Sequence, residues 1–391
     1  MNFEFSNNLK YFQTGIFNVL NDKKAELIKQ GKKVYNLSVG TPDFEPDEHV
    51  KQALIDCAKN SENWKYSLND MPELIDALIS YYKNRFNVNL NSDEIMSVYG
   101  SQEGLTHIGF SLCNKDDIVL VPNPGYPIFE IGPYLSGAEI AYYPLLPENN
   151  YLPNLDKIDE DILKRTKFMV VSYPMNPVCA TAPLEFYDEL IVFAKKHNII
   201  IIHDNAYSDI VYDGECGSSF LSHEGAKEVG VEFYSLSKSF NITGARVSFV
   251  VGNSDIIKHF KMLRSQIDYG IFKPIQHAAI AALTGPQDSV KLHCKEYEKR
   301  RNALCRGLSK IGWNVPDSKG SMFAWAPIPS NFKSSSDFCM ELMEKTGVIC
   351  TPGSAFGSLG EGYVRFALVL PVPIIEEAVS RIAESGILKT K

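Results

Sequence analysis

The sequence predicts an α/β protein whose mostly parallel sheet is covered by helices on both faces, together with a smaller α+β part. Seven short runs rich in β-branched and aromatic residues lie between residues 94 and 251, and helix-like segments separate most of them. Such alternation is typical of a parallel sheet that is buried on both faces. The last two runs are too close together for a crossover helix, so we expect the final strand to be antiparallel to its predecessor.

The individual elements follow from local patterns. The β-rich runs predict the strands of this sheet at residues 94–100, 117–121, 138–144, 167–174, 198–204, 231–237 and 245–251. Apolar residues at helical spacing predict helices at residues 16–30, 184–198, 286–312, 334–346 and 373–385. Further short strands are expected near residues 34–37, 320–328, 348–350 and 362–369. From this order we predict a large domain of residues 46–285 and a small domain made from residues 1–45 and 286–391.

The composition is that of an ordinary globular protein and argues against several classes. A chain of 391 residues usually forms two domains, and 45% hydrophobic with 22% charged residues suits a soluble protein. A net charge of −8 without a Lys/Arg run argues against nucleic-acid binding, and the longest aliphatic run, residues 199–202, is too short to span a membrane. The N-terminus has no apolar signal-peptide core. The eight scattered cysteines form no C-x-x-C pair, which indicates free thiols, no metal site and a reducing cytoplasm.

Polar residues follow the predicted strands one after another. In open α/β sheets, ligands bind beyond the carboxyl ends of the strands. The candidates in chain order are residues 100–104 at the start of a helix, Tyr126, Asn176, Asp204 with Tyr207, and Lys238. Each has an ordinary alternative, such as a helix start, a turn or an N-cap, but five in succession at strand ends indicate a binding site.

Two earlier positions are less distinctive. Gly40 begins a Gly-Thr-Pro turn, where the backbone could approach a ligand closely, although a plain turn explains these residues equally well. Tyr66 precedes a helix, and taken by itself it is interpreted as a core residue rather than a site residue.

Lys238 is the most informative candidate. Ser235 and Ser237 precede it, and Arg246 follows a few residues later. Hydroxyl groups and a permanent cation suit a phosphate, which accepts hydrogen bonds and needs positive charge. A lysine beside a phosphate site is either a phosphate ligand or an amine nucleophile, and for the second role pyridoxal phosphate is the obvious phosphorylated aldehyde. The alternative is a surface turn with a solvated lysine.

A serine acyl-enzyme is a rival interpretation. Residues 235–238 fit S-x-x-K and residues 345–347 fit the K-T-G of β-lactamase-like enzymes. However, the required S-x-N element would directly abut the lysine instead of lying on a separate loop. The K-T-G run is also expected to end a helix, where Gly347 would be an ordinary C-cap.

The run SLSKSFNITGARVSFVVGN at residues 235–253 resembles the S-L-S-K-[ST]-[FY]-N-[ML]-T-G-x-R-[IV] block of class I/II aminotransferases, which are fold-type I pyridoxal-phosphate-dependent enzymes. The resemblance extends from LSVGTPDF to GYVRFALV, and IDYGIFKPIQ and PGSAFGSLGEGYVRFALV resemble the branch around LL-diaminopimelate aminotransferase. It implies pyridoxal 5'-phosphate as cofactor, a large domain with a seven-stranded sheet, a small domain made from both termini, and a homodimer with shared sites.

The resemblance also implies a role for each matching position. The implied catalytic residues are Lys238, which would bind the cofactor's aldehyde, Asp204, which would pair with the pyridine nitrogen, and Tyr207. The phenolic oxygen of the ring would be bound by Asn176 and Tyr207, and Tyr126 would stack on the ring. The implied phosphate ligands are Ser101, Gln102, Ser235, Ser237, Arg246 and, across the subunit boundary, Tyr66. The implied binders of the substrate's α-carboxylate are Gly40, Asn176 and Arg365.

The chain departs from the family pattern at three places. Val178-Cys179 follow Asn176-Pro177 where the family usually has Thr-Gly, and Asp70 stands where the tyrosine loop usually carries a glycine. Residues 15–17 are Gly-Ile-Phe where some members have an aromatic residue that touches the substrate. The first two leave the implied catalytic groups intact, and the third weakens any specific substrate assignment.

We therefore predict transfer of an amino group between glutamate/2-oxoglutarate and a polar amino acid such as LL-diaminopimelate or aspartate. The alternatives are a β-elimination, decarboxylation or ring closure in the same site, and a broad-specificity alanine or aromatic aminotransferase. A non-enzymatic regulator that binds the same cofactor is a further alternative, but the sequence shows no basic helix-turn-helix.

Overall fold

The computed structural model describes residues 1–12 and 16–388, and the side chains of all of these except residues 16–18. Contacts between residues cluster in two units. The first unit comprises Met1–Gly40, Lys299–Ser318 and Met322–Lys391, and the second comprises Thr41–Glu298 and Lys319–Ser321. The predicted domain boundaries, residues 46–285 against 1–45 with 286–391, stay a prediction.

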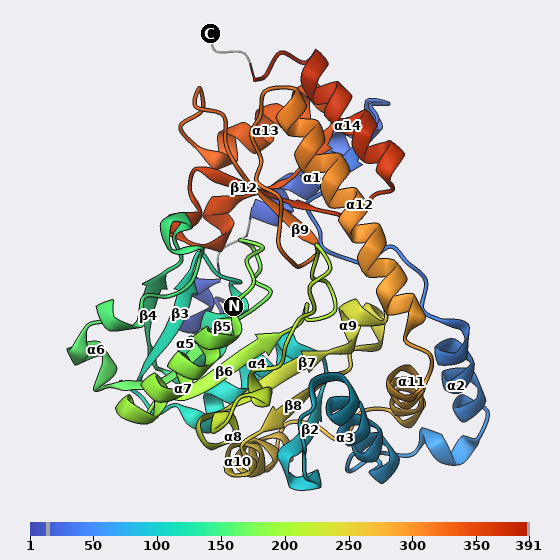
Figure 1. Ribbon diagram of the computed structural model, residues 1–391, viewed down its shortest axis with the longest axis vertical. Helices are drawn as coiled ribbons and strands as arrows, with labels where there is room; N and C mark the ends of the chain where they lie inside the picture. Colours follow the sequence, from blue (N-terminus) through green and yellow to red (C-terminus); the bar gives the residue numbers. More distant parts are fainter. Residues whose placement is uncertain (13–15, 389–391) are drawn as a thin grey trace. The chain divides into compact units, whose positions relative to one another are not determined.

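The second unit is built on one seven-stranded sheet (Figure 1), with the strand order β2-β8-β7-β6-β5-β3-β4. The strands are β2 (Ile95–Val98), β3 (Ile118–Asn123), β4 (Glu139–Pro144), β5 (Thr166–Ser172), β6 (Ile200–Asn205), β7 (Gly230–Ser235) and β8 (Ser248–Gly252). Neighbours pair in parallel except that β8 is antiparallel to both β7 and β2. The seven predicted strands and the antiparallel last strand are therefore confirmed.

Helices surround this sheet, and every residue of β2, β3, β7 and β8 is buried, which requires cover on both faces. The helices of this unit are α2 (Glu48–Ala58), α3 (Pro72–Phe86), α4 (Ser101–Leu112), α5 (Ile128–Ser136), α6 (Glu160–Leu163), α7 (Leu184–His197), α8 (Ala226–Val229), α9 (Leu236–Ser239), α10 (Ser254–Arg264) and α11 (Lys273–Thr284). Helices α4 and α5 touch backbone to backbone, because a Cβ on Gly132 would lie 2.1 Å from the carbonyl oxygen of Thr106.

The first unit contains two small sheets. β1 (Tyr35–Asn36) pairs in parallel with β10 (Val348–Ile349), and β11 (Thr351–Pro352), β12 (Tyr363–Ala367) and β9 (Phe323–Pro327) form an antiparallel sheet in that order. Its helices are α1 (Ile16–Lys29), α13 (Ser335–Thr346) and α14 (Val372–Glu384). The two-residue strand β11 was not predicted, because its second residue is Pro352 and proline argues against a strand.

The long helix α12 (Asp288–Lys310) contributes residues to both units. Short 3-10 turns complete the chain: η1 (Asn7–Tyr11), η2 (Ser61–Trp64), η3 (Ser92–Glu94), η4 (Pro147–Asn149), η5 (Leu155–Lys157), η6 (Phe220–Ser222), η7 (Thr243–Ala245), η8 (Gly353–Phe356) and η9 (Ser358–Gly360). Among the described residues, no helix combines the length with the apolar character that crossing a membrane requires.

Candidate functional site

An arginine side chain, that of Arg246, lies against the start of helix α4. Gly100 adopts φ 86° and is followed by Ser101, the first residue of the helix, and Gln102. The guanidinium of Arg246 lies against Gly100 so closely that a Cβ there would come within 2.2 Å of Nη2. It donates to the carbonyl oxygens of Thr243 at 3.0 Å and Tyr99 at 3.4 Å, and it stays exposed. Free backbone N–H groups, a positive helix end and an arginine are features that suit an anion.

Hydroxyl groups lie at the start of the one-turn helix α9, which holds Lys238. Ser235 caps this helix, and its Oγ accepts the N–H of Ser237 at 3.2 Å and the Oγ–H of Ser248 at 3.2 Å. Ser235 and Ser237 are buried, and Lys238 is half-buried. The hydroxyl of Ser101 is buried without a hydrogen-bond partner among the described residues.

Asp204, near the carboxyl end of β6, is the most unusual side chain of the site. It is 6% exposed, and its Oδ1 has no hydrogen-bond partner among the described residues. Burial, and secondarily the negative charge of Glu232, raise the pKa of this carboxyl from 3.8 to about 7. A buried carboxylate oxygen without a donor is costly, so this position suits a positively charged or N–H-bearing ligand.

Glu232 lies on the neighbouring strand β7, in register with His203. Its carboxylate accepts hydrogen bonds from Tyr82 O–H at 2.8 Å, Ser219 O–H at 2.8 Å and Phe220 N–H at 2.9 Å, and it lies 2.9 Å from His203 Nδ1. Glu232 and His203 are fully buried. Sequence reasoning missed this cluster, although a histidine and a glutamate inside two apolar strand runs were a usable signal.

The other residues predicted to contact the cofactor ring, Asn176, Tyr207 and Tyr126, lie in the same unit. Asn176 and Tyr207 are both 7% exposed, and the hydroxyl of Tyr126 donates to Oε1 of Gln102 at 3.1 Å. Tyr126 and Gln102 therefore form one hydrogen-bonded pair beside the start of α4.

The departure after Asn176-Pro177 has a structural correlate. Cys179 adopts φ 63°, a left-handed conformation that glycine adopts more easily, which accounts for the glycine usual at this place. Its N–H donates to the Met175 carbonyl at 2.8 Å, and Met175 N–H donates to the Ala180 carbonyl at 2.9 Å. These bonds close the turn that holds Asn176, so the turn forms without the glycine.

Tyr66 is 78% exposed, so its interpretation as a core residue is wrong. Its ring packs against that of Tyr269, with centroids 4.9 Å apart. The fully buried Gln276 holds both loops, because it donates to Ser67 Oγ at 2.8 Å and to the Ile271 carbonyl at 2.6 Å. Tyr66 thus lies on a fixed loop and faces solvent in this single chain.

Asp70, the second departure, binds the edge strand β2. Its carboxylate accepts the N–H of Ser97 at 2.9 Å and also the hydroxyl of Ser97. The replacement of the usual glycine therefore adds an anchor for the tyrosine loop.

Gly40 and Arg365 belong to the first unit, whereas the other candidates belong to the second. A Cβ on Gly40 would lie 2.4 Å from the ring of Phe323, so any larger residue would require this ring or the backbone to move. Arg365 is 5% exposed, its guanidinium carbon lies 4.0 Å from the Phe323 ring centroid, and Nη2 donates to the Ser38 carbonyl at 3.0 Å. Gly15 and the side chains of Ile16 and Phe17 lie outside the described residues.

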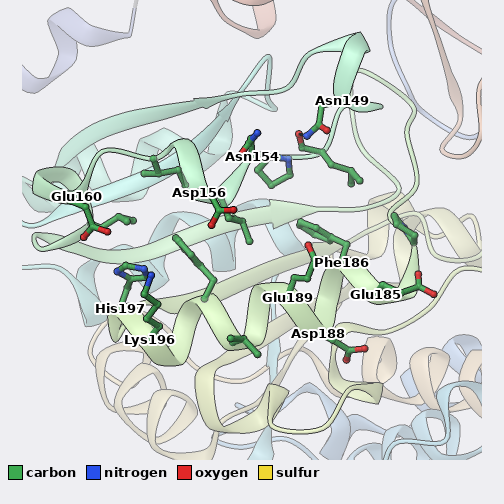
Figure 2. Close-up of a pocket in the computed structure, with 18 residues that line it drawn as sticks. Asn149, Asn154, Asp156, Glu160, Glu185, Phe186, Asp188, Glu189, Lys196 and His197 are labelled. Carbon is green, nitrogen blue, oxygen red and sulfur yellow. Dashed lines mark hydrogen bonds between the residues drawn. The ribbon is translucent and has the colours of Figure 1, made fainter.

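One cavity and the K-T-G run at residues 345–347 lie apart from the predicted site residues in the sequence. A cavity of about 800 Å³ is lined by residues from 149–163 and by helix α7, including Phe186, Glu189 and His197, and none of its lining residues is a predicted site residue (Figure 2). The K-T-G run of the serine acyl-enzyme alternative ends helix α13, where Gly347 at φ 77° is the C-cap, so it does not form a site-lining strand.

The chain matches known proteins over most of its length. Residues 32–382 match the family Aminotransferase class I and II. An LL-diaminopimelate aminotransferase from Halothermothrix orenii is 42% identical over 386 residues, which are 98% of this chain and 99% of that protein. One from Aquifex aeolicus is 39% identical over 382 residues, with 97% and 98% covered. Among solved structures, substrate-bound BacF from Bacillus subtilis has a TM-score of 0.94 at 35% identity and 98% coverage of both chains.

Proposed function

The chain belongs to the class I and II aminotransferase family and is a pyridoxal-phosphate-dependent transaminase, and from this premise we propose which of its residues act and on which amino acids. We propose Lys238, Asp204 and Tyr207 as the catalytic residues. We further propose a homodimeric cytoplasmic enzyme that uses glutamate/2-oxoglutarate as one pair and a polar amino acid as the other substrate.

Two buried polar atoms support the proposed cofactor contacts. The unpartnered Oδ1 of Asp204 suits a protonated ring nitrogen, because this buried oxygen has no donor among the described residues. The unpartnered hydroxyl of Ser101, at the helix start beside Arg246, suits a phosphate oxygen. Gln102, Ser235 and Ser237 would complete the phosphate site. Residues of this chain thus match both polar ends of pyridoxal phosphate.

Bound pyridoxal phosphate supplies an electron sink that is conjugated to the α-carbon of the amino acid. The side chains of this protein are proposed to move or hold protons at the cofactor and to orient the substrate. The Lys238 amine would take the proton from the substrate α-carbon and deliver it to C4′ of the cofactor. Asp204 would keep the ring nitrogen protonated, and Asn176 and Tyr207 would donate to the phenolic oxygen. Arg365 would bind the α-carboxylate with two parallel hydrogen bonds, which orients the Cα–H bond.

The observation that carries the assignment of Lys238 is its place on α9, directly after the buried serines 235 and 237. Purified protein should be yellow, and borohydride reduction should attach the cofactor irreversibly to Lys238, as peptide mapping would show. Labelling of another lysine, or of none, would contradict the assignment.

The homodimer is proposed because Tyr66, the implied phosphate ligand, is exposed in the single chain on a loop that Gln276 and Asp70 hold in place. Mixing inactive Lys238→Ala subunits with Tyr66→Phe subunits, if the second change also inactivates, should restore activity in mixed dimers. If mixed dimers form without any regain of activity, each site is complete within one chain.

The polar substrate is proposed on two grounds. The relatives reported above are named LL-diaminopimelate aminotransferases. The loop at residues 267–273 also offers the hydroxyl of Tyr269, which is 55% exposed, and the ammonium of Lys273 at the start of α11. These groups suit a polar or carboxylate-bearing distal end better than an aliphatic one, because a desolvated cation without a partner is costly.

A panel of amino donors against 2-oxoglutarate tests the substrate proposal through kcat/KM. LL-diaminopimelate or aspartate should be preferred over alanine, leucine and phenylalanine. If any apolar donor exceeds every polar one tenfold, about 1.4 kcal/mol of transition-state preference, the polar pocket is wrong and a broad-specificity enzyme is favoured.

A further inference from the structure

We infer that Asp209, which matches no site residue of the sequence pattern, is a positioning residue that holds the loop of Tyr207 and the helical turn of Lys238 in a fixed relation. This inference rests on the proposed roles of Tyr207 and Lys238. Asp209 lies two residues after Tyr207, and its carboxylate binds Ser239, the residue directly after Lys238.

Three hydrogen bonds converge on this carboxylate from three different elements. Its Oδ2 accepts Ser239 Oγ–H of α9 at 2.5 Å and Tyr234 O–H of β7 at 3.0 Å. Its Oδ1 accepts Arg85 Nε–H of α3 at 3.2 Å, and the Asp209 side chain is only 5% exposed. Asp209 is therefore bound from three sides and excluded from water.

The same contacts hold the backbone of the Tyr207 loop. Arg85 Nη2 donates to the carbonyl of Ser208 at 3.4 Å, between Tyr207 and Asp209. The Tyr207 carbonyl accepts Ile210 N–H at 2.9 Å, which closes the turn around Asp209. Tyr234 is in turn bound to Tyr81 O–H at 2.7 Å, so the network ends in the buried core.

Stability alone is a weak reason for this arrangement, since apolar residues of similar volume often replace a buried ion pair without loss. A catalytic amine and a phenol that act on one ligand must, however, keep their separation to within about 0.5 Å. Displacing such a group by about 1 Å can cost 100-fold in rate. A single carboxylate that binds the neighbours of both groups meets this requirement.

The test compares three variants of the cofactor-loaded enzyme. Asp209→Asn removes the charge and one acceptor, and Ser239→Ala removes only the link to α9 while the pair with Arg85 remains. The control Glu94→Gln removes another carboxylate that bridges a cation, Lys227 Nζ at 2.9 Å, away from the proposed site. Each variant is measured for kcat, for KM of the amino donor, and for the pH midpoint of the bound cofactor's visible absorbance.

Asp209→Asn should lower kcat between about 10-fold and 100-fold with KM changed less than about threefold. Its absorbance midpoint should move by about half a pH unit or more, because the surroundings of the Lys238 amine change. Ser239→Ala should show the same changes to a smaller degree, and it decides the question if Asp209→Asn does not fold. Glu94→Gln should lower stability without moving the absorbance midpoint.

The inference is overturned if the folded Asp209 and Ser239 variants keep wild-type kcat within about twofold and an unmoved absorbance midpoint, or if Glu94→Gln changes both to the same extent. Borohydride mapping of the wild-type enzyme separates this failure from a failure of the proposed function. Cofactor attached to Lys238 with insensitive variants contradicts only the role of Asp209, whereas attachment elsewhere contradicts the role of Lys238.

Discussion

Asp204 and Glu232 are buried carboxylates on neighbouring strands of one sheet, and their surroundings differ. Glu232 accepts three hydrogen bonds from Tyr82, Ser219 and Phe220 and lies within hydrogen-bond distance of His203. Asp204 has one oxygen without any donor among the described residues. The comparison indicates that the fold satisfies Glu232 by itself, whereas it leaves one oxygen of Asp204 available to the proposed ligand.

This difference in hydrogen bonding suggests a structural role for Glu232 and a ligand-binding role for Asp204. A buried charge with a full set of donors contributes to a defined arrangement of the core, and losing a donor costs stability. A buried carboxylate with an oxygen that lacks a donor costs stability in the cofactor-free protein, and binding of a cationic ligand recovers that stability. Four changes test the comparison, from the largest expected effect to the smallest.

The pH dependence of the cofactor-free protein should reveal the cost of Asp204. Its pKa is raised from 3.8 to about 7, so the folded state binds the proton more tightly than the unfolded state. Its contribution to the free energy of unfolding therefore decreases as pH rises from about 4 to about 7 and is constant above that. At about 1.36 kcal/mol per pKa unit, Asp204→Asn should exceed wild type by up to ~4 kcal/mol at pH 8 and match it near pH 4.

Urea unfolding of both cofactor-free proteins across this pH range measures the difference. A difference that does not depend on pH would show that Asp204 titrates alike in the folded and unfolded states, and the contrast with Glu232 would then lose its electrostatic basis.

Glu232→Gln should destabilise the protein, whereas Asp204→Asn should stabilise it. An amide cannot accept from all of the surrounding donors, so the free energy of unfolding should fall by about 3 kcal/mol. If the variant folds, it should still bind the cofactor, because Glu232 is not a proposed ligand. Unfolding titrations and cofactor absorbance check both points, and loss of cofactor binding from a stable variant would contradict the division of roles.

Asp204→Ala should retain the cofactor but lose transamination, because nothing then keeps the ring nitrogen protonated. We expect kcat/KM to fall at least about 100-fold, which corresponds to ~2.7 kcal/mol. Steady-state kinetics with glutamate measures the loss, and near-native turnover would refute the assigned role of Asp204.

Tyr82→Phe removes one of the donors to Glu232 and leaves the ring in place. Stability should fall by about 1 kcal/mol, the usual net value of one buried hydrogen bond, while kcat stays at the wild-type level. Denaturant midpoints and initial rates are the two measurements. A change in rate without a change in stability would place Tyr82 in the reaction instead of the core.

The secondary structure and the main chemistry were readable from the sequence because their signals are local. The seven strands of the large sheet have β-rich runs of their own, and the long helices have apolar residues at helical spacing. The carboxyl ends of parallel strands lie at one edge of the sheet. The positions of Asp204, Tyr207 and Lys238 after successive strands therefore predicted that these residues lie near one another. Helices α2, α10 and α11 were not predicted, and neither was β11, whose two residues pair with β12.

The sequence by itself therefore determined the sheet, its antiparallel last strand and the family to which the protein belongs. Tertiary structure alone decided which carboxylate is satisfied and which is not, because the donors come from distant parts of the chain. Tyr82 lies 150 residues from Glu232, and Arg85 lies 124 residues from Asp209. Exposure of Tyr66 was decided in the same way. Hydrogen-bond partners and burial are properties of packed neighbours, and sequence patterns of short range do not carry them.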